Sequence, residues 1–315
     1  MVAMEQRPSL PPPPTDVEYC YRHPGVATAV HCTRCGRPIC PDCMIPAPVG
    51  HHCPTCVAEA RAEYRRGPGR RVAVAGAMGI SITGVLVAII VAIYVIEVVA
   101  GGAGSLFDGP SLQRLVDMGA AIGVFGRGTT VEGGIAAGQY WRLFTSMFLH
   151  ANLIHIALNS YALWIFGSML EPEIGRSRFL IVYLVTGLGA SAASYAFLSP
   201  FTVGVGASGA IFGIFGIFLV YNYRRRHTPL GAARLRTGVV LLVINLAIGF
   251  SVPGIDWRAH IGGLVAGIVA GFAVDSRGSA SARRAAFAVG MLAIVAATVV
   301  LVAWRTTQLH AQLGL

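Results

Sequence analysis

The sequence predicts an all-α membrane protein that crosses the bilayer several times and is preceded by a small cysteine-rich domain. Of its 315 residues, 55% are hydrophobic and 12% are charged, whereas a soluble domain carries about a quarter charged residues. Uncharged apolar runs recur along the body of the chain, and all seven cysteines lie between Cys20 and Cys56. We therefore expect two domains, a head formed by residues 1–71 and a membrane domain formed by residues 72–315.

Six uncharged apolar runs supply candidates for seven membrane spans, because a helix needs about 20 apolar residues to cross the hydrocarbon. They are residues 72–96, 143–170, two spans within 179–223, then 237–255, 259–274 and 285–304. Ser199-Pro200 and the glycines that follow predict the turn that divides the third run. One such run could be a buried core helix, but seven in succession favour a membrane protein.

The arginines predict the orientation of these spans. With a cytoplasmic N-terminus, the cytoplasmic segments hold 15 arginines and the external segments hold five. The positive-inside rule then places the head in the cytoplasm and the C-terminus outside, in a multi-pass protein of the cell membrane. The net charge of +10 does not indicate nucleic acid as a partner, because the arginines border apolar runs and do not line one polar face. We expect these arginines to interact with the surface of the lipid bilayer.

The head carries four pairs of metal-binding residues with one spacing. They are Cys20-x2-His23, Cys32-x2-Cys35, Cys40-x2-Cys43 and Cys53-x2-Cys56. Eight ligands suffice for two tetrahedral zinc ions, and an odd number of cysteines in the cytoplasm argues against disulfides. The zinc-binding module would span about residues 18–58, with a basic linker up to residue 71. Its zinc would be structural, and the head could recruit a cytoplasmic protein partner. His31, His51 and His52 are left over. His52 could replace a cysteine as a ligand, but with eight better candidates present we expect it to be solvent-exposed.

Polar side chains lie inside the predicted spans, where they are costly and usually functional. His150, His155 and Asn159 belong to the second span, Ser208 opens the fourth, and His260 opens the sixth. These three spans enter from outside, and His150, His155, Ser208 and His260 are each near the start of their span. These four side chains therefore fall at a similar depth in the outer half of the membrane. A serine and a histidine at matched depth can form a nucleophile and its general base.

The remaining polar residues near this depth suggest supporting roles. Asn159 follows His155 by four residues and shares its helix face, so the two side chains could hold a developing oxyanion. His150 would be turned away on a regular helix, and we expect it at the helix mouth in an orienting role. Asp256 precedes His260 by four residues, but we expect it to be a solvated loop acid and not a third member of a triad.

Glycines four residues apart occur in the fourth and sixth spans, at positions 209 and 213 and at 263, 267 and 271. Such faces let helices approach closely, which would bring Ser208 to His260, although ordinary helix packing also explains these glycines.

The sequence does not support the other classes of protease. The sequence has no His-Glu-x-x-His motif, no pair of aspartates in a span, and no Gly-x-Ser-x-Gly elbow.

These motifs, in this order, resemble the rhomboid family of intramembrane serine proteases over about residues 72–305. The matching motifs are Trp141-Arg142, His150…His155…Asn159, Gly206-Ala-Ser208-Gly209 and Ala259-His260-x-x-Gly263. The resemblance implies six core helices around a water-filled cavity, and residues 285–304 resemble the extra C-terminal helix of a six-plus-one arrangement. The spacings of the head resemble a B-box-type zinc finger, in which pairs one and three bind one metal and pairs two and four bind the other.

The resemblance also implies roles for individual residues. Ser208 and His260 would form a dyad without an acid, and His155, Asn159 and the Ser208 backbone N–H would form the oxyanion site. Phe212, one turn after Ser208, would pack on the histidine, and Glu171 would be structural. Substrates would be transmembrane proteins whose helices unwind near the outer leaflet, because helical carbonyls are already hydrogen-bonded.

Two other functions remain as alternatives. The first is a non-catalytic rhomboid-like protein that binds or chaperones membrane clients, and the presence of both Ser208 and His260 weakens it. The second is a metal transporter supplied by the zinc head. It is weakened because His150 and His155 have no acidic partner in the spans.

Overall fold

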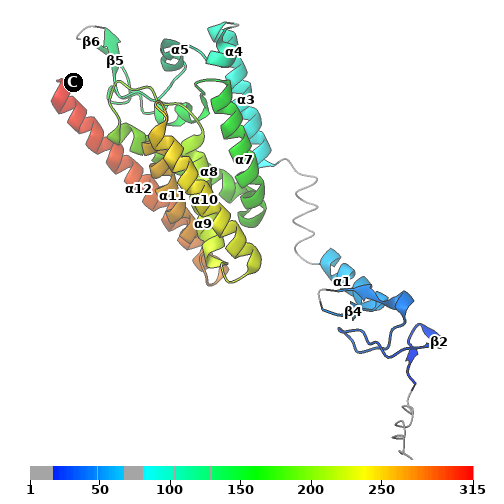
Figure 1. Cartoon of the computed structure of the whole chain (residues 1–315). Coiled ribbons are helices and arrows are strands. Elements are labelled where there is room, and N and C mark those ends of the chain that lie inside the picture. The colour runs from blue at the N-terminus through cyan, green and yellow to red at the C-terminus, as the bar shows by residue number, and fades with distance from the viewer. Residues whose placement is uncertain (1–16, 48, 67–80, 103, 128–129, 315) are drawn as a thin grey trace, which may run out of the picture. The chain divides into compact units, whose positions relative to one another are not determined.

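The computed structural model of the chain describes residues 17–47, 49–66, 81–102, 104–127 and 130–314. The chain divides into two compact units, Met1–Gly79 and Ile80–Leu315, and both appear in the cartoon of Figure 1. The domain boundary that we expect at residue 71, and the start of the first expected span, lie outside the described residues.

The first unit has little regular structure and a very small core. Its elements are β1 (Tyr19–Cys20), β2 (His23–Ala27), the 3₁₀ helix η1 (Pro41–Cys43), β3 (Ile45–Pro46), β4 (His51–His52) and α1 (Pro54–Arg66). β1 pairs with β2 and β3 pairs with β4, both antiparallel. Six cysteines and Ile39 are the residues buried together. An apolar core of this size seldom stabilises a domain alone, so the fold is typical of modules held by metals or disulfides.

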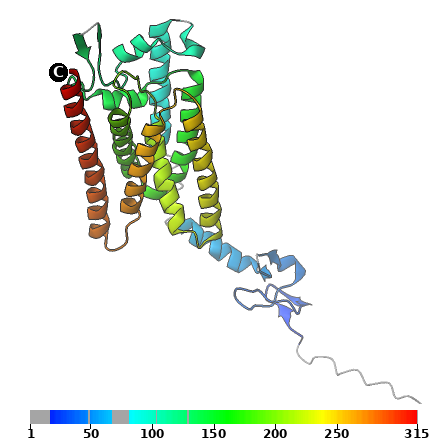
Figure 2. The ribbon, with the colours of Figure 1, turned by 60° about the vertical axis from the view of Figure 1, so that its left-hand side comes forward.

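The second unit is helical, which confirms the predicted fold class. Its long helices are α3 (Ile82–Gly101), α7 (Leu153–Ile174), α8 (Arg176–Phe197), α9 (Ser208–Arg224), α10 (Pro229–Ser251), α11 (Trp257–Val274) and α12 (Ala280–Leu313). Each coincides with one of the expected spans. Within the described ranges, six of them are long and apolar enough to cross a membrane, and α9 is shorter, with 17 residues. Figure 2 shows the bundle from a second side.

The second expected span begins later than its sequence suggests. Residues 143–152 are apolar enough for a helix, but the chain there forms the short α6 (Arg142–Thr145) and the 3₁₀ helix η2 (Ser146–Phe148). α7 starts only at Leu153, because the Asn152 side chain accepts the His155 backbone N–H at 2.9 Å and caps the helix. The segment between α3 and α7 also holds α4 (Ser105–Asp108), α5 (Leu112–Asp117) and the hairpin of β5 (Phe125–Arg127) and β6 (Thr130–Gly133).

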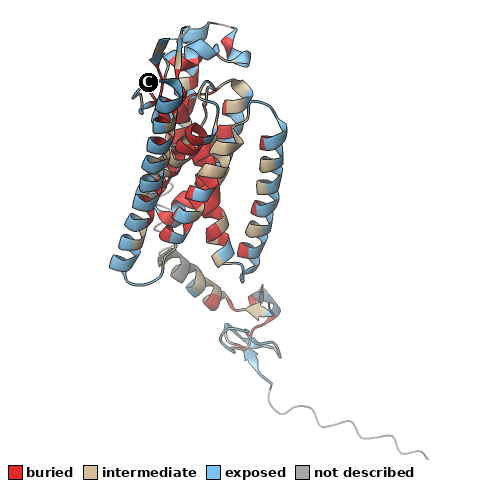
Figure 3. Cartoon of the chain, turned by 90° about the vertical axis from the view of Figure 1, so that its left-hand side faces the viewer, coloured by how far each residue is buried: buried red, intermediate tan, exposed pale blue. Residues whose placement is uncertain are grey.

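The helix α9 forms the centre of this unit, and most of its residues are buried (Figure 3). It packs on α7, α8, α10 and most extensively on α11. At the contact with α11, a Cβ added to Gly263 would lie 2.0 Å from the carbonyl oxygen of Gly209. The two backbones therefore touch, as the glycine spacing predicts. By contrast, α10 and α12 expose apolar side chains along their length, for example Val243 and Val299. In a membrane, lipid covers such surfaces.

Glu171 ties the last part of α7 to the start of α3, in agreement with the structural role expected for it. Its carboxylate accepts hydrogen bonds from the Ser81 hydroxyl and the Ile82 backbone N–H, both at 2.9 Å. It also accepts the backbone N–H of Thr83 at 2.9 Å and the Thr83 hydroxyl at 2.7 Å. One buried acid thus satisfies several of the N–H groups that a helix start leaves unpaired.

Candidate active site and metal clusters

The starts of α9 and α11 bring a serine and a histidine together. Ser208 is the first residue of α9 and His260 lies in the first turn of α11. The Ser208 Oγ is 3.0 Å from the His260 Nε2. The Phe212 ring stacks on the imidazole, with 4.2 Å between ring centroids and 11° between planes. Gly209 lets α9 lie close to α8, because a Cβ there would lie 2.5 Å from the Cβ of Ala190 on α8.

Asp256 makes no hydrogen bond to Ser208 or His260 through its side chain. Its carboxylate accepts the backbone N–H groups of Arg258 and Ala259, both at 3.1 Å, and also the Ser194 hydroxyl. It is therefore an ordered cap of α11 and half-buried, and not the solvated loop acid that we expected. The His260 Nδ1 is buried and has no hydrogen-bond partner in the described part of the chain.

The side-chain N–H groups of His155 and Asn159 lie next to Gly206, two residues before Ser208. Gly206 has φ +124°, and a Cβ there would lie 2.7 Å from the His155 Nε2 and 3.6 Å from the Asn159 Nδ2. The His155 Nδ1 accepts the Ala151 backbone N–H at 3.4 Å, so the proton of a neutral ring is on Nε2. The Asn159 Nδ2 is buried without a partner among the described residues. Both N–H groups thus lie beside Gly206, two residues before the serine.

His150 lies before α7 and supports this arrangement from one side. Its Nδ1 is 3.2 Å from the Phe148 carbonyl oxygen, and its ring meets the His155 ring edge-on, with centroids 5.2 Å apart. Its backbone N–H donates to the buried Glu97 carboxylate of α3 at 3.1 Å. The sequence marks Glu97 only as a charge at the end of an apolar run and gives no sign of this partner.

Trp141 and Arg142 belong to the loop region and are not in contact with the serine. The Arg142 guanidinium is buried, where it donates to the carbonyls of Val116 and Ala120 at 2.7 and 3.1 Å and to the Gln139 side chain at 2.6 Å. It also lies over the Trp141 ring, 4.7 Å from the centroid. These contacts connect the start of α6 with α5 and the loop that follows it.

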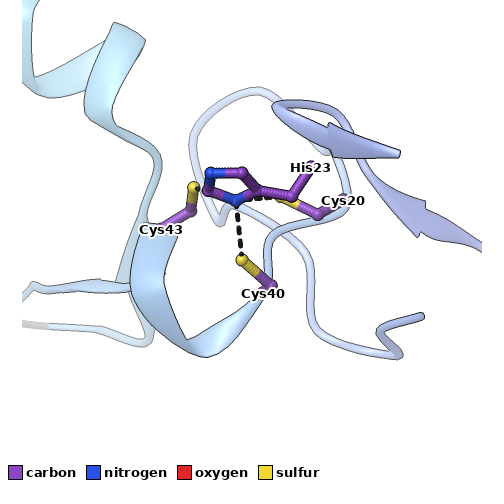
Figure 4. Close-up of side chains that lie close together, drawn as sticks. All are labelled: Cys20, His23, Cys40 and Cys43. Atoms are coloured by element: carbon purple, nitrogen blue, oxygen red, sulfur yellow. Dashed lines mark hydrogen bonds between the residues drawn. The ribbon is translucent and has the colours of Figure 1, made fainter. Parts of the chain in front are cut away.

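In the head, the structure brings the ligand pairs together in the interleaved order expected from the B-box resemblance. One cluster holds Cys20, His23, Cys40 and Cys43, and the other holds Cys32, Cys35, Cys53 and Cys56. Within each cluster, the atoms that could bind a metal lie within 4.8 Å of one another. Figure 4 shows the first cluster, in which the His23 Nδ1 is 3.1 Å from the Cys40 sulfur. Both clusters have the donor sets and the spacing of tetrahedral metal sites.

The thiols of the first cluster ionise unequally. Burial opposes the ionisation of Cys20, but hydrogen bonds from the backbone N–H groups of neighbouring residues lower its pKa to about 6. Burial, together with the neighbouring Cys20 and Cys40 thiols, raises the pKa of Cys43 to about 11. A divalent cation between these sulfurs would permit both to ionise, since only thiolates bind metals well.

The spare histidines of the head lie outside both clusters. His31 is exposed and its ring hydrogen-bonds the Glu18 carboxylate. His51 and His52 form β4, which pairs with β3, and both are half-buried, so His52 is not solvent-exposed as we expected. In the described part of the head, none of the three lies in a group that could hold a metal.

Comparison with known proteins identifies relatives of the second unit. The family model of the Rhomboid domain matches residues 137–277. The rhomboid protease GluP of Bacillus subtilis is 42% identical over 140 residues, which cover 44% of this chain and 27% of that protein. The putative rhomboid protease YdcA of the same bacterium is 35% identical over 139 residues, which cover 44% of this chain and 69% of that protein.

A plant protein, RHOMBOID-like protein 6, mitochondrial, of Arabidopsis thaliana, is 40% identical over 141 residues. That match covers 44% of this chain and 45% of the plant protein. The chain therefore spans about a quarter of the length of GluP and less than half of that of the plant protein. The matched residues of the family model include Ser208 and His260, whereas the clusters of the head lie outside them.

Proposed function

This chain belongs to the rhomboid family, and on that basis we propose that it is an intramembrane serine endopeptidase with Ser208 as nucleophile and His260 as general base. The observation that carries the proposal is the 3.0 Å contact between the Ser208 Oγ and the His260 Nε2. A serine hydroxyl attacks a peptide carbonyl only when a neighbour takes its proton. The contact supports such a transfer.

In the proposed reaction, the imidazole accepts the hydroxyl proton while the Ser208 Oγ forms a bond to the scissile carbonyl carbon. His260 then gives the proton to the departing amine, and water hydrolyses the acyl-enzyme by the same steps. The stacked Phe212 ring supports this role because it restricts the rotation of the imidazole. No acid is needed to orient the ring, since the stacking and the Ser208 hydroxyl both do so.

The oxyanion that forms during the attack would be held by three N–H groups. These are the His155 Nε2, the Asn159 Nδ2 and the backbone N–H of Ser208, which is free of intrahelical bonds because α9 begins there. The Asn159 Nδ2, which is buried without a partner among the described residues, and the closeness of both side chains to Gly206 support this assignment. Each donor of this kind typically contributes about 10²–10³ in turnover.

The substrates we propose are transmembrane proteins of the cell membrane, cleaved near the outer leaflet. The starts of α9 and α11 lie at the same end of the unit as the arginine-poor segments, which the positive-inside rule assigns to the outside. The head and the N-terminus would then be cytoplasmic and the C-terminus external. Substrate helices must unwind to expose a carbonyl, so glycine or proline near the cleavage site would favour cleavage.

For the head, we propose that its two clusters bind two structural zinc ions. The Cys₃His and Cys₄ donor sets fit zinc, and no ligand position is left open for chemistry. Zinc there would supply folding energy to a domain with a very small apolar core. Such a domain could bind a cytoplasmic protein partner.

Cleavage of a model substrate by the purified full chain in detergent tests the catalytic proposal. The substrate carries a transmembrane helix destabilised by glycine and proline, and the test compares the wild type with Ser208→Ala. Ser168→Ala is the matched control, because Ser168 is an exposed serine of α7 whose hydroxyl bonds a carbonyl of its own helix. A fluorophosphonate probe, which labels activated serines, gives a second readout that needs no substrate.

We expect cleavage and labelling by the wild type and the control, and neither by Ser208→Ala. Equal cleavage by the wild type and Ser208→Ala would disprove the role of Ser208. Absence of both cleavage and labelling in a folded wild type would favour the non-catalytic alternative that binds membrane clients.

A further inference from the structure

A basic pocket lies at the end of the helical unit opposite Ser208 and His260. Its volume is about 220 Å³, and its lining is Arg224, Arg225, Asp275, Ser276 and Arg277. α9 begins at Ser208 and ends at Arg224, so the pocket is about 24 Å from the serine along the helix axis. This distance separates the pocket from the proposed active site.

The single acid of this lining holds two guanidinium groups in place. The Asp275 carboxylate accepts two hydrogen bonds from Arg225, at 3.0 and 3.1 Å, and lies 3.3 Å from the Arg224 Nε. The Arg225 guanidinium is further fixed over the Tyr221 ring, 3.5 Å from the centroid. Three guanidinium groups against one carboxylate leave the lining with a surplus of two positive charges.

Two further groups of the lining have unused hydrogen-bond donors. The Ser276 Oγ is shielded from solvent and has no partner among the described residues. Arg277 is exposed, and its side chain makes no hydrogen bond or ion pair within the same part of the chain. Glu173 accepts the nearby Tyr221 hydroxyl but does not line the pocket. The pocket thus offers positive charge and free donors, and its one carboxylate, Asp275, already contacts Arg224 and Arg225.

We propose that this pocket binds the phosphate group of an anionic membrane phospholipid. A guanidinium presents its N–H groups in a fork that matches two phosphate oxygens, and basic pockets at the ends of transmembrane helices bind lipid headgroups. Val289 and Leu292 are exposed on α12, which begins five residues after Asp275. These apolar side chains offer a surface to acyl chains, which favours a lipid over free phosphate.

Binding there would act on the helices that carry the proposed dyad. The Arg224–Asp275 ion pair joins the last residue of α9 to the residue that follows α11. A phosphate that bridges Arg224 and Arg277 would hold the same two helix ends together. A bound anionic lipid should therefore raise the unfolding temperature of the protein, whether or not the protein is a protease.

Native mass spectrometry of the full chain in detergent tests this site, with thermal unfolding as a second measurement. The protein is titrated with phosphatidylglycerol, with phosphatidylcholine, and with inorganic phosphate. Arg277→Gln is the test variant, because its side chain supports no contact of the fold. Arg236→Gln is the matched control, since Arg236 is exposed at the same end of the unit and lies outside the pocket.

We expect phosphatidylglycerol to bind more tightly than phosphatidylcholine and to raise the unfolding temperature. Arg277→Gln should weaken phosphatidylglycerol binding about fivefold, which corresponds to ~1 kcal/mol for one basic residue, and Arg236→Gln should leave it unchanged. If both variants weakened phosphatidylglycerol binding equally, the binding would depend on general surface charge and not on this pocket, and the proposal would be overturned. Stabilisation by inorganic phosphate that phosphatidylglycerol does not reproduce would assign the pocket to a soluble anion and also overturn it.

Discussion

A Cβ on Gly267 of α11 would lie 2.0 Å from the carbonyl oxygen of Gly213 of α9, so the two helix backbones touch at this point. The same helices carry Ser208 and His260 at their starts. The distance between those two side chains is therefore set by contacts of glycine with backbone, which cannot adjust as a side chain can.

We predict that Gly267→Ala lowers both stability and cleavage. The added methyl group would force the helices apart, and overpacking of this kind costs about 1–3 kcal/mol. Thermal unfolding in detergent measures the loss. Gly84→Ala on α3 is the matched control, because its Cβ would meet only the Ser81 Cβ, at 3.8 Å. Equal losses in the two variants would show that the helix contact is not the cause.

His260→Ala should abolish cleavage as fully as Ser208→Ala, and the double variant should be no worse than either. Groups that act as one unit are not additive, because removal of one leaves the other without a role. Turnover of the three variants on one substrate measures this. Substantial residual turnover in His260→Ala would mean that another base serves Ser208, and His150 would be the first to test.

The pairing of Ser208 with His260 could be expected from the sequence, because counting the spans places both side chains at a similar depth. The interleaved order of the head clusters was implied only by the resemblance to a B-box-type zinc finger. Once the spans are counted, their alternating direction determines at which membrane face the start of each span lies. The start of α7 could not be predicted in this way. Hydropathy continues unbroken from Leu143, and only the cap formed by Asn152 ends the preceding loop.

Asn159→Ala should lower turnover by about 10²–10³ and leave substrate binding nearly unchanged, because an oxyanion donor acts only once the carbonyl has been attacked. Donation by His155 in its place would reduce this loss. Separate measurement of kcat and KM distinguishes the cases. Ser160→Ala is the control, as Ser160 also has a buried hydroxyl without a partner in the described structure but lies on another face of α7. An unchanged kcat with a raised KM would place Asn159 in substrate binding.

Other contacts between distant segments could not be predicted from the sequence. Glu97 appears there only as one charge in an apolar run, and its bond to the backbone of His150 joins residues 53 positions apart. The sequence likewise gives no sign that Arg224, the last residue of α9, pairs with Asp275, the residue that follows α11. The packing of α9 on α11 makes them neighbours. Periodicity reports the faces of one helix, but it does not say which partner each face meets.

Glu171→Ala should destabilise the helical unit by on the order of 3 kcal/mol, since hydrogen bonds to a charged group contribute about 1.5–3 kcal/mol each and are not additive. The loss should appear as a lower unfolding temperature, with normal turnover in the fraction that remains folded, because the start of α3 is at the end opposite Ser208. Glu173→Ala, two residues away and exposed, should change stability by less than about 1 kcal/mol. A selective loss of turnover without a loss of stability would contradict the structural role.

Metal analysis of the purified full chain should give about two zinc ions per molecule, as the two four-ligand clusters require. Cys43→Ser and Cys53→Ser should each lower this to about one, because each removes a ligand from a different cluster, and His52→Ala should retain both ions.

Removal of zinc by a chelator should unfold the head, since metal binding is its main source of folding energy. Cleavage in detergent should nevertheless persist, both after chelation and in a protein shortened to residues 72–315. The proposed orientation places the head at the membrane face opposite Ser208, about 30 Å of hydrocarbon away, so a head ligand cannot reach the reacting atoms. One zinc ion per molecule in the wild type would contradict the two-cluster assignment. A loss of cleavage while the helical unit stays folded would show that the head takes part in the reaction.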